Sequence, residues 1–182
     1  MQIGVPKETK NHEYRVGLAP SSVREIVSHG HQIVVEQQAG EGIGASDADY
    51  RSAGATVTED VARLFNECDM IVKVKEPQAD EREMLREGQI LFTYLHLAPD
   101  SEQTEDLVKS GATCIAYETV TSPHGGLPLL APMSKVAGRM AIQAGAHCLE
   151  QPHGGLGMLL GGVPGVPPAK VVILGSGVVG TH

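Results

Sequence analysis

The sequence has few cysteines, little positive charge and no long apolar run. Cys68, Cys114 and Cys148 are odd in number and far apart, so they predict neither a disulfide framework nor a CxxC metal site. Fourteen Lys and Arg stand against 22 Asp and Glu, which argues against sequence-independent binding to nucleic acid or anionic membranes. No stretch reaches the roughly 18 apolar residues of a membrane span, and the first residues lack the features of a signal peptide. We therefore expect a soluble, cytoplasmic protein whose partner is a small molecule.

Short β-branched runs alternate with helical stretches over the first two thirds of the chain. The expected strands cover residues 2–6, 31–36, 70–74, 89–95 and 113–117, and the expected helices cover residues 20–29, 58–66, 80–86 and 101–110. This alternation predicts an α/β fold, a Rossmann-like parallel sheet flanked by helices. We assign residues 1–132 to this first domain, which would bind the substrate.

The remaining third changes in character. A longer helix is expected over residues 133–151, with small and apolar side chains at helical spacing, as in a core stripe or a helix-packing seam. A Gly- and Pro-rich stretch follows to residue 168, so that residues 133–168 read as an interdomain helix and connection. Residues 169–182 then contain a short apolar run, typical of a buried strand, and a glycine loop.

That glycine loop, Gly175-Ser176-Gly177-Val178-Val179-Gly180, has the spacing of a dinucleotide-binding fingerprint at the exit of the expected strand. Such a loop is normally followed by a helix and, about 20 residues on, by an acidic residue that binds the ribose. We expect neither this helix nor this acidic residue within the sequence, whose last residue is His182. We interpret residues 169–182 as the truncated start of a second Rossmann domain that binds NAD; the alternative is a simple tight turn.

Three expected strands lead into residues suited to binding and proton transfer. Arg15 follows the first strand and is either a carboxylate clamp or a solvated surface residue. Lys73 and Lys75 share one face of the strand 70–74, and Lys75 lies at its end, where it needs solvent or an anion. His96 ends an apolar strand and is either an acid-base group or a core histidine. Because the carboxyl ends of parallel strands meet at one edge, these residues together suit a small anionic substrate.

No metal site is expected. His29 and His31 have a spacing that could chelate a metal, but no third ligand accompanies them.

Several segments resemble the alanine dehydrogenase and pyridine nucleotide transhydrogenase family, with the lysine and histidine motifs closest to bacterial alanine dehydrogenase. The resemblance extends over the whole chain, and its segments occur in the same order. They are residues 4–8, 15–18, 73–77, 94–98, 116–120, 128–134, 137–140 and 162–166.

The resemblance implies reversible, NAD-dependent oxidative deamination of L-alanine to pyruvate and ammonia. It implies that Arg15 and Lys75 bind the substrate and that His96 is the acid-base catalyst. It also implies that Ser134 contacts the cofactor, that Met133 lies near the nicotinamide, and that the pyrophosphate lies against the glycine loop. The cofactor residues would be Met133, Ser134, Gly175, Gly177, Val178, Val179 and Gly180. The family assembles into homo-hexamers, so a hexamer is expected by resemblance.

Two residues depart from the family pattern, Ala19 before the first helix and His182 at the last position. The 182 residues would hold only the substrate half of the site, so we expect them to be inactive alone. Two alternatives remain open. One is a non-catalytic domain of the transhydrogenase type, which binds pyruvate or nucleotide or associates with other subunits. The other is a dehydrogenase of another small 2-amino acid.

Overall fold

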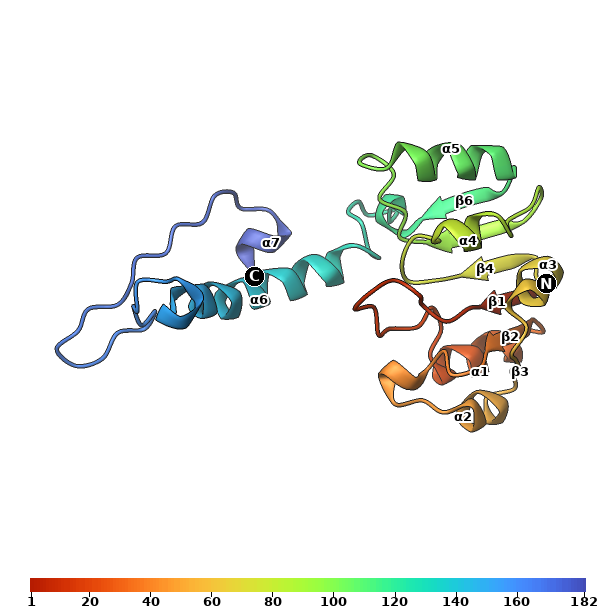
Figure 1. Cartoon of the computed structure of the whole chain (residues 1–182), viewed down its shortest axis with the longest axis horizontal. Helices are drawn as coiled ribbons and strands as arrows, with labels where there is room; N and C mark the ends of the chain where they lie inside the picture. The colour runs from red at the N-terminus through yellow and green to blue at the C-terminus, as the bar shows by residue number, and fades with distance from the viewer. The chain divides into compact units, whose positions relative to one another are not determined.

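The computed structural model describes residues 1–182, which form two compact units, Met1–Val120 and Thr121–His182. The first unit holds a parallel sheet between helices, and the second is built on one long helix (Figure 1).

The sheet of the first unit has six parallel strands in the order β3-β2-β1-β4-β5-β6. This is the order of a doubly wound dinucleotide-binding fold, and it confirms the expected Rossmann-like sheet. The strands are β1 (Gln2–Val5), β2 (Gln32–Glu36), β3 (Thr56–Thr58), β4 (Met70–Val72), β5 (Ile90–Thr93) and β6 (Thr113–Ala116).

Alternation along each strand divides the core between the two faces of the sheet. One face packs against α1 (Pro20–Ser28) and α2 (Asp47–Ser52), where Val23 and Tyr50 are fully buried. The other face packs against α3 (Val61–Glu67) and α5 (Ser101–Ser110), which contribute Leu64 and Leu107. Helices therefore cover both faces, as a parallel sheet requires.

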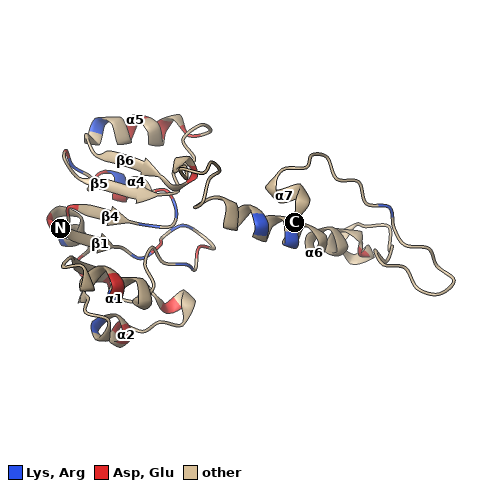
Figure 2. Cartoon of the chain, turned by 180° about the vertical axis from the view of Figure 1, so that it is seen from behind, with Lys and Arg blue, Asp and Glu red and all other residues tan.

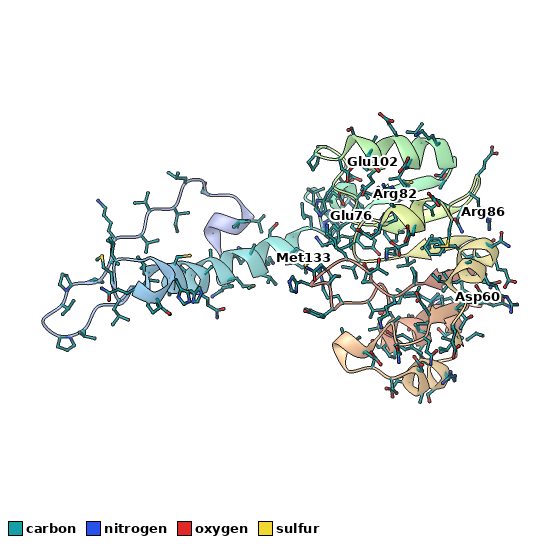
Figure 3. The ribbon with its side chains drawn as sticks, viewed as in Figure 1. Asp60, Glu76, Arg82, Arg86, Glu102 and Met133 are labelled. Carbon is teal, nitrogen blue, oxygen red and sulfur yellow. The ribbon has the colours of Figure 1, made fainter.

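Ion pairs join α4 (Ala79–Arg82) to α5 at one edge of the unit. Arg82 Nε lies 2.9 Å from Asp106 Oδ2, and its Nη2 lies 3.5 Å from Glu102 Oε1. Figure 3 shows Arg82 and Glu102 between these two helices. These ion pairs hold α4 against α5.

The topology has a switch point at β1. The chain leaves β1 to build β2 and β3 on one side, and later returns to build β4, β5 and β6 on the other. Loops that follow strands on the two sides of such a point diverge, leaving a crevice at the carboxyl edge of the sheet.

The second unit consists of α6 (Ala131–Leu149), the 3-10 turn η3 (Gln151–His153), a long extended segment and α7 (Val178–Thr181). Gly138 is the buried residue of α6, because α7 packs against the helix there. Charged side chains are sparse in this unit (Figure 2). Many of its apolar side chains are exposed, including those of Val171, Val172, Ile173 and Leu174.

The expected elements of the first unit are largely present, with two corrections. Residues 58–66 were expected to be one helix, but Thr58 belongs to β3 and α3 begins only at Val61. The Asp60 side chain accepts the Arg63 N–H at 2.9 Å, which caps α3 and fixes its start. Neither β3 nor α2 was expected, since both are very short.

Two expectations for the second unit are wrong. Residues 169–174 form no strand, because no neighbouring strand pairs with their backbone. No helix was expected there, yet the one-turn helix α7 begins within the glycine loop, at Val178 directly after Gly177. The break between the two compact units follows Val120, and the domain boundary after residue 132 stays a prediction. No helix is long and apolar enough to cross a membrane.

Candidate active site

Arg15 lies in the loop that leaves β1, where it is held by Glu13. Its Nε donates to Glu13 Oε1 at 2.7 Å, a second guanidinium nitrogen pairs with Oε2, and its backbone N–H donates to Oε1 at 2.9 Å. This pairing lowers the pKa of the Glu13 carboxyl and raises that of Arg15. Both residues line a hollow of about 310 Å³ between the loops that follow β1 and β2, whose wall also includes Glu8. Arg15 is thus preorganised and remains 44% exposed.

The two lysines after β4 have different environments. Lys73 is fully buried, with its Nζ 2.7 Å from Glu81 Oε1 and 3.5 Å from Glu8 Oε2. Lys75 is half-buried, and no hydrogen bond or ion pair joins its ammonium to another side chain. Lys73 is therefore a structural residue, while Lys75 is available to a ligand.

Glu8 connects the β1 loop to the end of β4. Its carboxylate accepts the backbone N–H groups of Val74 at 2.6 Å and Lys75 at 3.3 Å. Burial raises the pKa of Glu8, and the Lys73 ammonium and these N–H groups oppose the shift. The contact fixes the backbone of Lys75 against the loop that carries Arg15.

His96 follows β5 and is exposed, so the core-histidine alternative is wrong. Its backbone has a φ of 50°, which is uncommon for a residue other than glycine. The Glu118 carboxylate, from the end of β6, accepts the backbone N–H groups of His96 at 2.7 Å and Leu95 at 3.1 Å. Burial alone would raise the pKa of Glu118, but these donors hold it below its usual value. The Tyr94 ring stacks beside the His96 ring at 6.1 Å between centroids.

Arg15, Lys75 and His96 therefore follow three adjacent strands, β1, β4 and β5, at the same edge of the sheet. Electrostatic interactions connect them. Arg15 is the main cause of the low Glu13 pKa, and the Lys75 ammonium acts in the same direction. Burial raises the pKa of Tyr94, the neighbour of His96, and the Arg15 charge opposes this. Two cations and an imidazole thus share one edge, as the sequence predicted.

The sequence did not identify the carboxylates that hold this edge together. Glu8 was seen only as part of a family motif, and Glu118 only as part of another. Glu118 could have been found by the rule that selected His96, because it also follows the end of a strand. Its contact with the His96 backbone joins residues 22 positions apart, and nothing local in the sequence indicates it.

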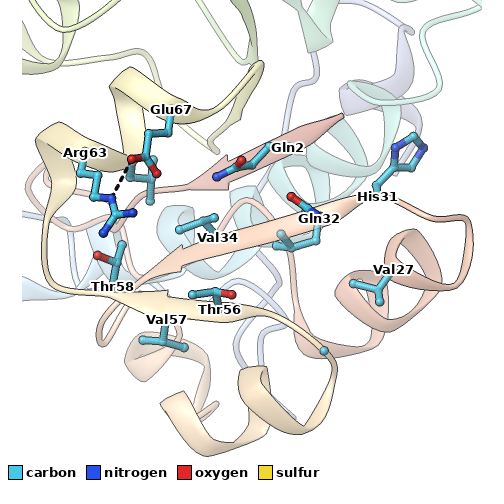
Figure 4. Close-up of a pocket in the computed structure, with 13 residues that line it drawn as sticks. Gln2, Val27, His31, Gln32, Val34, Thr56, Val57, Thr58, Arg63 and Glu67 are labelled. Atoms are coloured by element: carbon cyan, nitrogen blue, oxygen red, sulfur yellow. Dashed lines mark hydrogen bonds and ion pairs between the residues drawn. The ribbon is translucent and has the colours of Figure 1, made fainter.

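A larger cavity lies elsewhere in the first unit and contains none of the predicted site residues. It measures about 550 Å³ and runs along the face of β1, β2 and β3 beside α3 (Figure 4). Its wall includes Gln2, Gln32 and Thr56, and a surface ion pair of 2.8 Å between Arg63 and Glu67. This cavity lies on a sheet face and not at the carboxyl edge, so we do not assign it to the site.

Two positions of the glycine loop in the second unit can hold only glycine. Gly175 has a φ of 103°, and a Cβ on Gly180 would lie 2.2 Å from the Gly175 carbonyl oxygen, so both positions require glycine. Gly177 precedes α7, and a Cβ there would meet open space. The backbone at Gly177 is therefore open to close approach by a phosphate, next to the helix start at Val178 and Val179.

Ser134 lies on α6 one turn before Gly138, on the same side of the helix. A Cβ on Gly138 would lie 2.4 Å from the Val179 carbonyl oxygen, which shows how closely α6 and α7 pack. Met133 is partly exposed beside Ser134. The loop, Ser134 and Met133 thus belong to one compact unit, which could hold a cofactor.

The fold and the site define a protein of the doubly wound α/β class with two cations and an imidazole at the carboxyl edge of its sheet. Two family models match the chain, "Alanine dehydrogenase/PNT, N-terminal domain" over residues 4–137 and "Alanine dehydrogenase/PNT, C-terminal domain" over residues 141–182. The chain belongs to the alanine dehydrogenase/PNT family, as the resemblance indicated.

Similar proteins agree with this assignment. The chain is 63% identical over 182 residues to alanine dehydrogenase of Halomonas elongata, covering 100% of this chain and 49% of the relative. It is 51% identical over 180 residues to the alanine dehydrogenase of Mycobacterium tuberculosis, covering 99% of this chain and 48% of the relative. The chain thus spans about half the length of these relatives.

Solved structures give the same result. An L-alanine dehydrogenase matches with a TM-score of 0.89 and 57% identity, covering 100% of this chain and 50% of that structure. A transhydrogenase from Sinorhizobium meliloti matches with a TM-score of 0.77 and 28% identity, covering 99% and 53%.

Proposed function

We propose that this chain carries residues for the NAD-dependent oxidative deamination of L-alanine to pyruvate and ammonia. The supporting observation is the arrangement of Arg15, Lys75 and His96 after three adjacent strands at the switch point of the sheet. Names of relatives at 51–63% identity support the same reaction.

In this proposal Arg15 binds the substrate carboxylate through parallel hydrogen bonds, for which a guanidinium is well shaped. Lys75 contacts the same carboxylate and the carbonyl or imine group beside it. Glu13 orients Arg15 and balances its charge before the substrate arrives. Glu8 fixes the backbone of Lys75, so both cations are positioned before binding, which lowers the entropic cost of binding.

His96 is the proposed acid-base catalyst. L-alanine loses a hydride from Cα and a proton from its amino group, which gives an imine. Water then adds to the imine carbon, and ammonia leaves to give pyruvate. An imidazole changes charge near neutral pH, so His96 can accept a proton from nitrogen or water and return it to the leaving nitrogen. Glu118 holds the backbone that presents this ring.

We propose NAD as the cofactor, which accepts the hydride when it is bound. Gly175, Gly177 and Gly180 would shape the phosphate-binding loop, and the backbone of Val178 and Val179 would lie next to the pyrophosphate. Ser134 and Met133 would contact the cofactor from α6. None of these cofactor residues would distinguish NAD from NADP, so the proposed preference for NAD rests on the family.

A hexamer and a cytoplasmic location stay predictions from the resemblance. The alternative function is a non-catalytic domain that binds pyruvate or nucleotide. The similarity to a transhydrogenase supports this alternative. His96 separates the two functions, because a pure binding domain needs no acid-base group beside the substrate.

The test measures pyruvate binding with this chain, and alanine-dependent NADH formation with a version extended to the length of its relatives, because we expect the 182 residues to be inactive alone. We expect Arg15→Gln to weaken pyruvate binding roughly 10- to 100-fold, since hydrogen bonds to charged groups contribute about 1.5–3 kcal/mol. Arg24→Gln is the matched control, because Arg24 is an exposed arginine on α1. NMR titration of the backbone amides shows whether binding occurs at the carboxyl edge of the sheet.

The His96→Gln variant distinguishes catalysis from binding. We expect it to retain pyruvate binding and to lose NADH formation, while His31→Gln, at a half-buried position before β2, retains both. Pyruvate binding without any NADH formation by the extended wild type would favour the non-catalytic alternative. Equal turnover in His96→Gln and wild type would rule out His96 as the catalyst.

A further inference from the structure

Three potential metal ligands converge at the end of α6, outside every residue assigned to the reaction. His147, in the last turn of α6, Glu150 and His153, in η3, offer ligand atoms that all lie within 4.8 Å of one another. Glu150 Oε2 lies 3.3 Å from His153 Nδ1 and 3.9 Å from His147 Nδ1. The imidazole centroids are 3.7 Å apart.

The backbone holds this cluster in place. The Glu150 N–H donates to the His147 carbonyl at 3.2 Å, and the His153 N–H donates to the Glu150 carbonyl at 3.0 Å. Gly154 follows with a φ of 81°. The Gly154 N–H donates to the Gln151 carbonyl, and the Gly155 N–H donates to the Glu150 carbonyl, which closes the turn. The backbone of the three residues is therefore fixed before an ion binds, and the two imidazole rings would rotate apart to coordinate it.

The turn brings together residues that a continuous helix would separate. In a helix of 3.6 residues per turn, His153 would lie about 120° around the axis from His147. Instead α6 ends at Leu149, and Glu150 adopts an extended backbone (φ −70°, ψ 137°) that turns the chain back. The sequence predicted no metal site because this convergence depends on the turn and not on spacing.

The separations fit a first-row transition ion. Zn–N and Zn–O bonds of about 2.0–2.2 Å in a tetrahedral site place neighbouring ligand atoms roughly 3.3–3.5 Å apart. The measured 3.3 and 3.9 Å lie close to this value. Imidazole favours Zn²⁺, Cu²⁺ and Ni²⁺ over Mg²⁺ and Ca²⁺, which prefer oxygen ligands.

We propose that His147, Glu150 and His153 form a surface site for a divalent transition-metal ion, with Zn²⁺ as the type case. Two neutral imidazoles and one carboxylate supply three ligands, and water fills the remaining position. The ion would fasten η3 to the end of α6, just before the glycine-rich segment of the unit. The proposal is independent of the dehydrogenase function.

The experiment titrates Zn²⁺ into the full chain, freed of metal by a chelator, and follows binding by calorimetry. The expected result is one Zn²⁺ per chain. In His147→Gln and His153→Gln the affinity should fall by at least about 10- to 100-fold, the range seen for loss of partners around a metal. Circular dichroism confirms that each variant keeps its helices.

Two matched controls identify the ligands. Cys148→Ser removes an exposed thiol next to His147 that is not part of the converging group, and His124→Gln removes an exposed histidine from another loop of the unit. Both should bind Zn²⁺ as the wild type does. Cu²⁺ in place of Zn²⁺ should show coupling to two imidazole nitrogens by electron paramagnetic resonance, and to one in His153→Gln.

The proposal is overturned if the wild type shows no saturable Zn²⁺ binding. It is also overturned if binding survives unchanged in His147→Gln and His153→Gln, or is lost in Cys148→Ser or His124→Gln. In the first of these cases, the contacts among the three residues are only surface ion pairs, which contribute little to stability.

Discussion

Replacing Lys73 by methionine should remove several kcal/mol from the stability of the first unit. The Lys73 side chain is only 1% exposed, and its ammonium lies between the Glu81 and Glu8 carboxylates. Methionine keeps much of the apolar packing but leaves two buried carboxylates without their cation. Removing one partner of a buried ion pair costs about 3–5 kcal/mol, out of about 5–15 kcal/mol for a typical domain. We expect a loss in this range at neutral pH.

The loss should become smaller in acid. Burial holds the pKa of Glu8 above its ordinary 4.5, and Lys73 opposes this shift, so Lys73→Met raises the pKa further. A carboxyl with a raised pKa favours folding below its unfolded pKa, and this contribution is lost as pH rises through the folded pKa. The variant should therefore differ least from the wild type below about pH 4.5 and most at neutral pH.

Urea unfolding followed by near-ultraviolet circular dichroism measures this unit selectively. The chain has no tryptophan, and its four tyrosines all lie in the first unit, at Tyr14, Tyr50, Tyr94 and Tyr117. Lys75→Met is the matched control, since Lys75 is half-buried and unpaired, and it should cost less than about 1 kcal/mol. Equal losses for the two lysine variants would refute the assignment of Lys73 as the cation of a buried network.

Three further predictions follow from single contacts. Glu118→Gln should weaken the acid dependence of stability in urea titrations at several pH values, because the carboxylate's contribution is present above about pH 4.5 and is lost as pH falls through its lowered pKa. Gly17→Ala should lower the melting temperature, with a cost of about 1–3 kcal/mol, because its Cβ would lie 2.5 Å from the Val72 carbonyl oxygen. Gly177→Ala should retain its helix content but weaken NADH binding in fluorescence titrations, whereas Gly161→Ala, also in open space, should not; equal binding in both would contradict the proposed phosphate loop.

The parallel sheet was predictable because each of its main strands is a short apolar run between polar loops. The helix at Ser101–Ser110 matched its expected range, since Asp100 caps its start and Gly111 ends it with a φ of 69°. The missed helix α2 also carried a signal, because Ser46 and Asp49 form a capping box that the sequence shows at the required spacing. Strand β3 had no comparable signal, as three residues are too few to show alternation.

The apolar run at residues 169–174 shows that a local sequence pattern alone does not predict a strand. Its β-branched side chains suit a buried strand, yet Leu174 is 95% exposed and the segment pairs with no other strand. A strand is defined by hydrogen bonds to its neighbours, so propensity alone cannot specify one. In the first unit every expected strand found a parallel partner, which is why the same kind of pattern succeeded there.

The candidate site also has a part that the sequence predicts and a part that it does not. Arg15, Lys75 and His96 were predictable, because strand order places the ends of β1, β4 and β5 side by side and the residue types carry the chemistry. Their positions depend on Glu13, Glu8 and Glu118, and two of these three contacts join residues more than 20 positions apart. A cluster of cations at one edge is stable only with such counter-charges, since unpaired charges near the core are costly. The carboxylates therefore belong to the candidate site as much as the cations do, although the contacts that they make are not visible in local sequence.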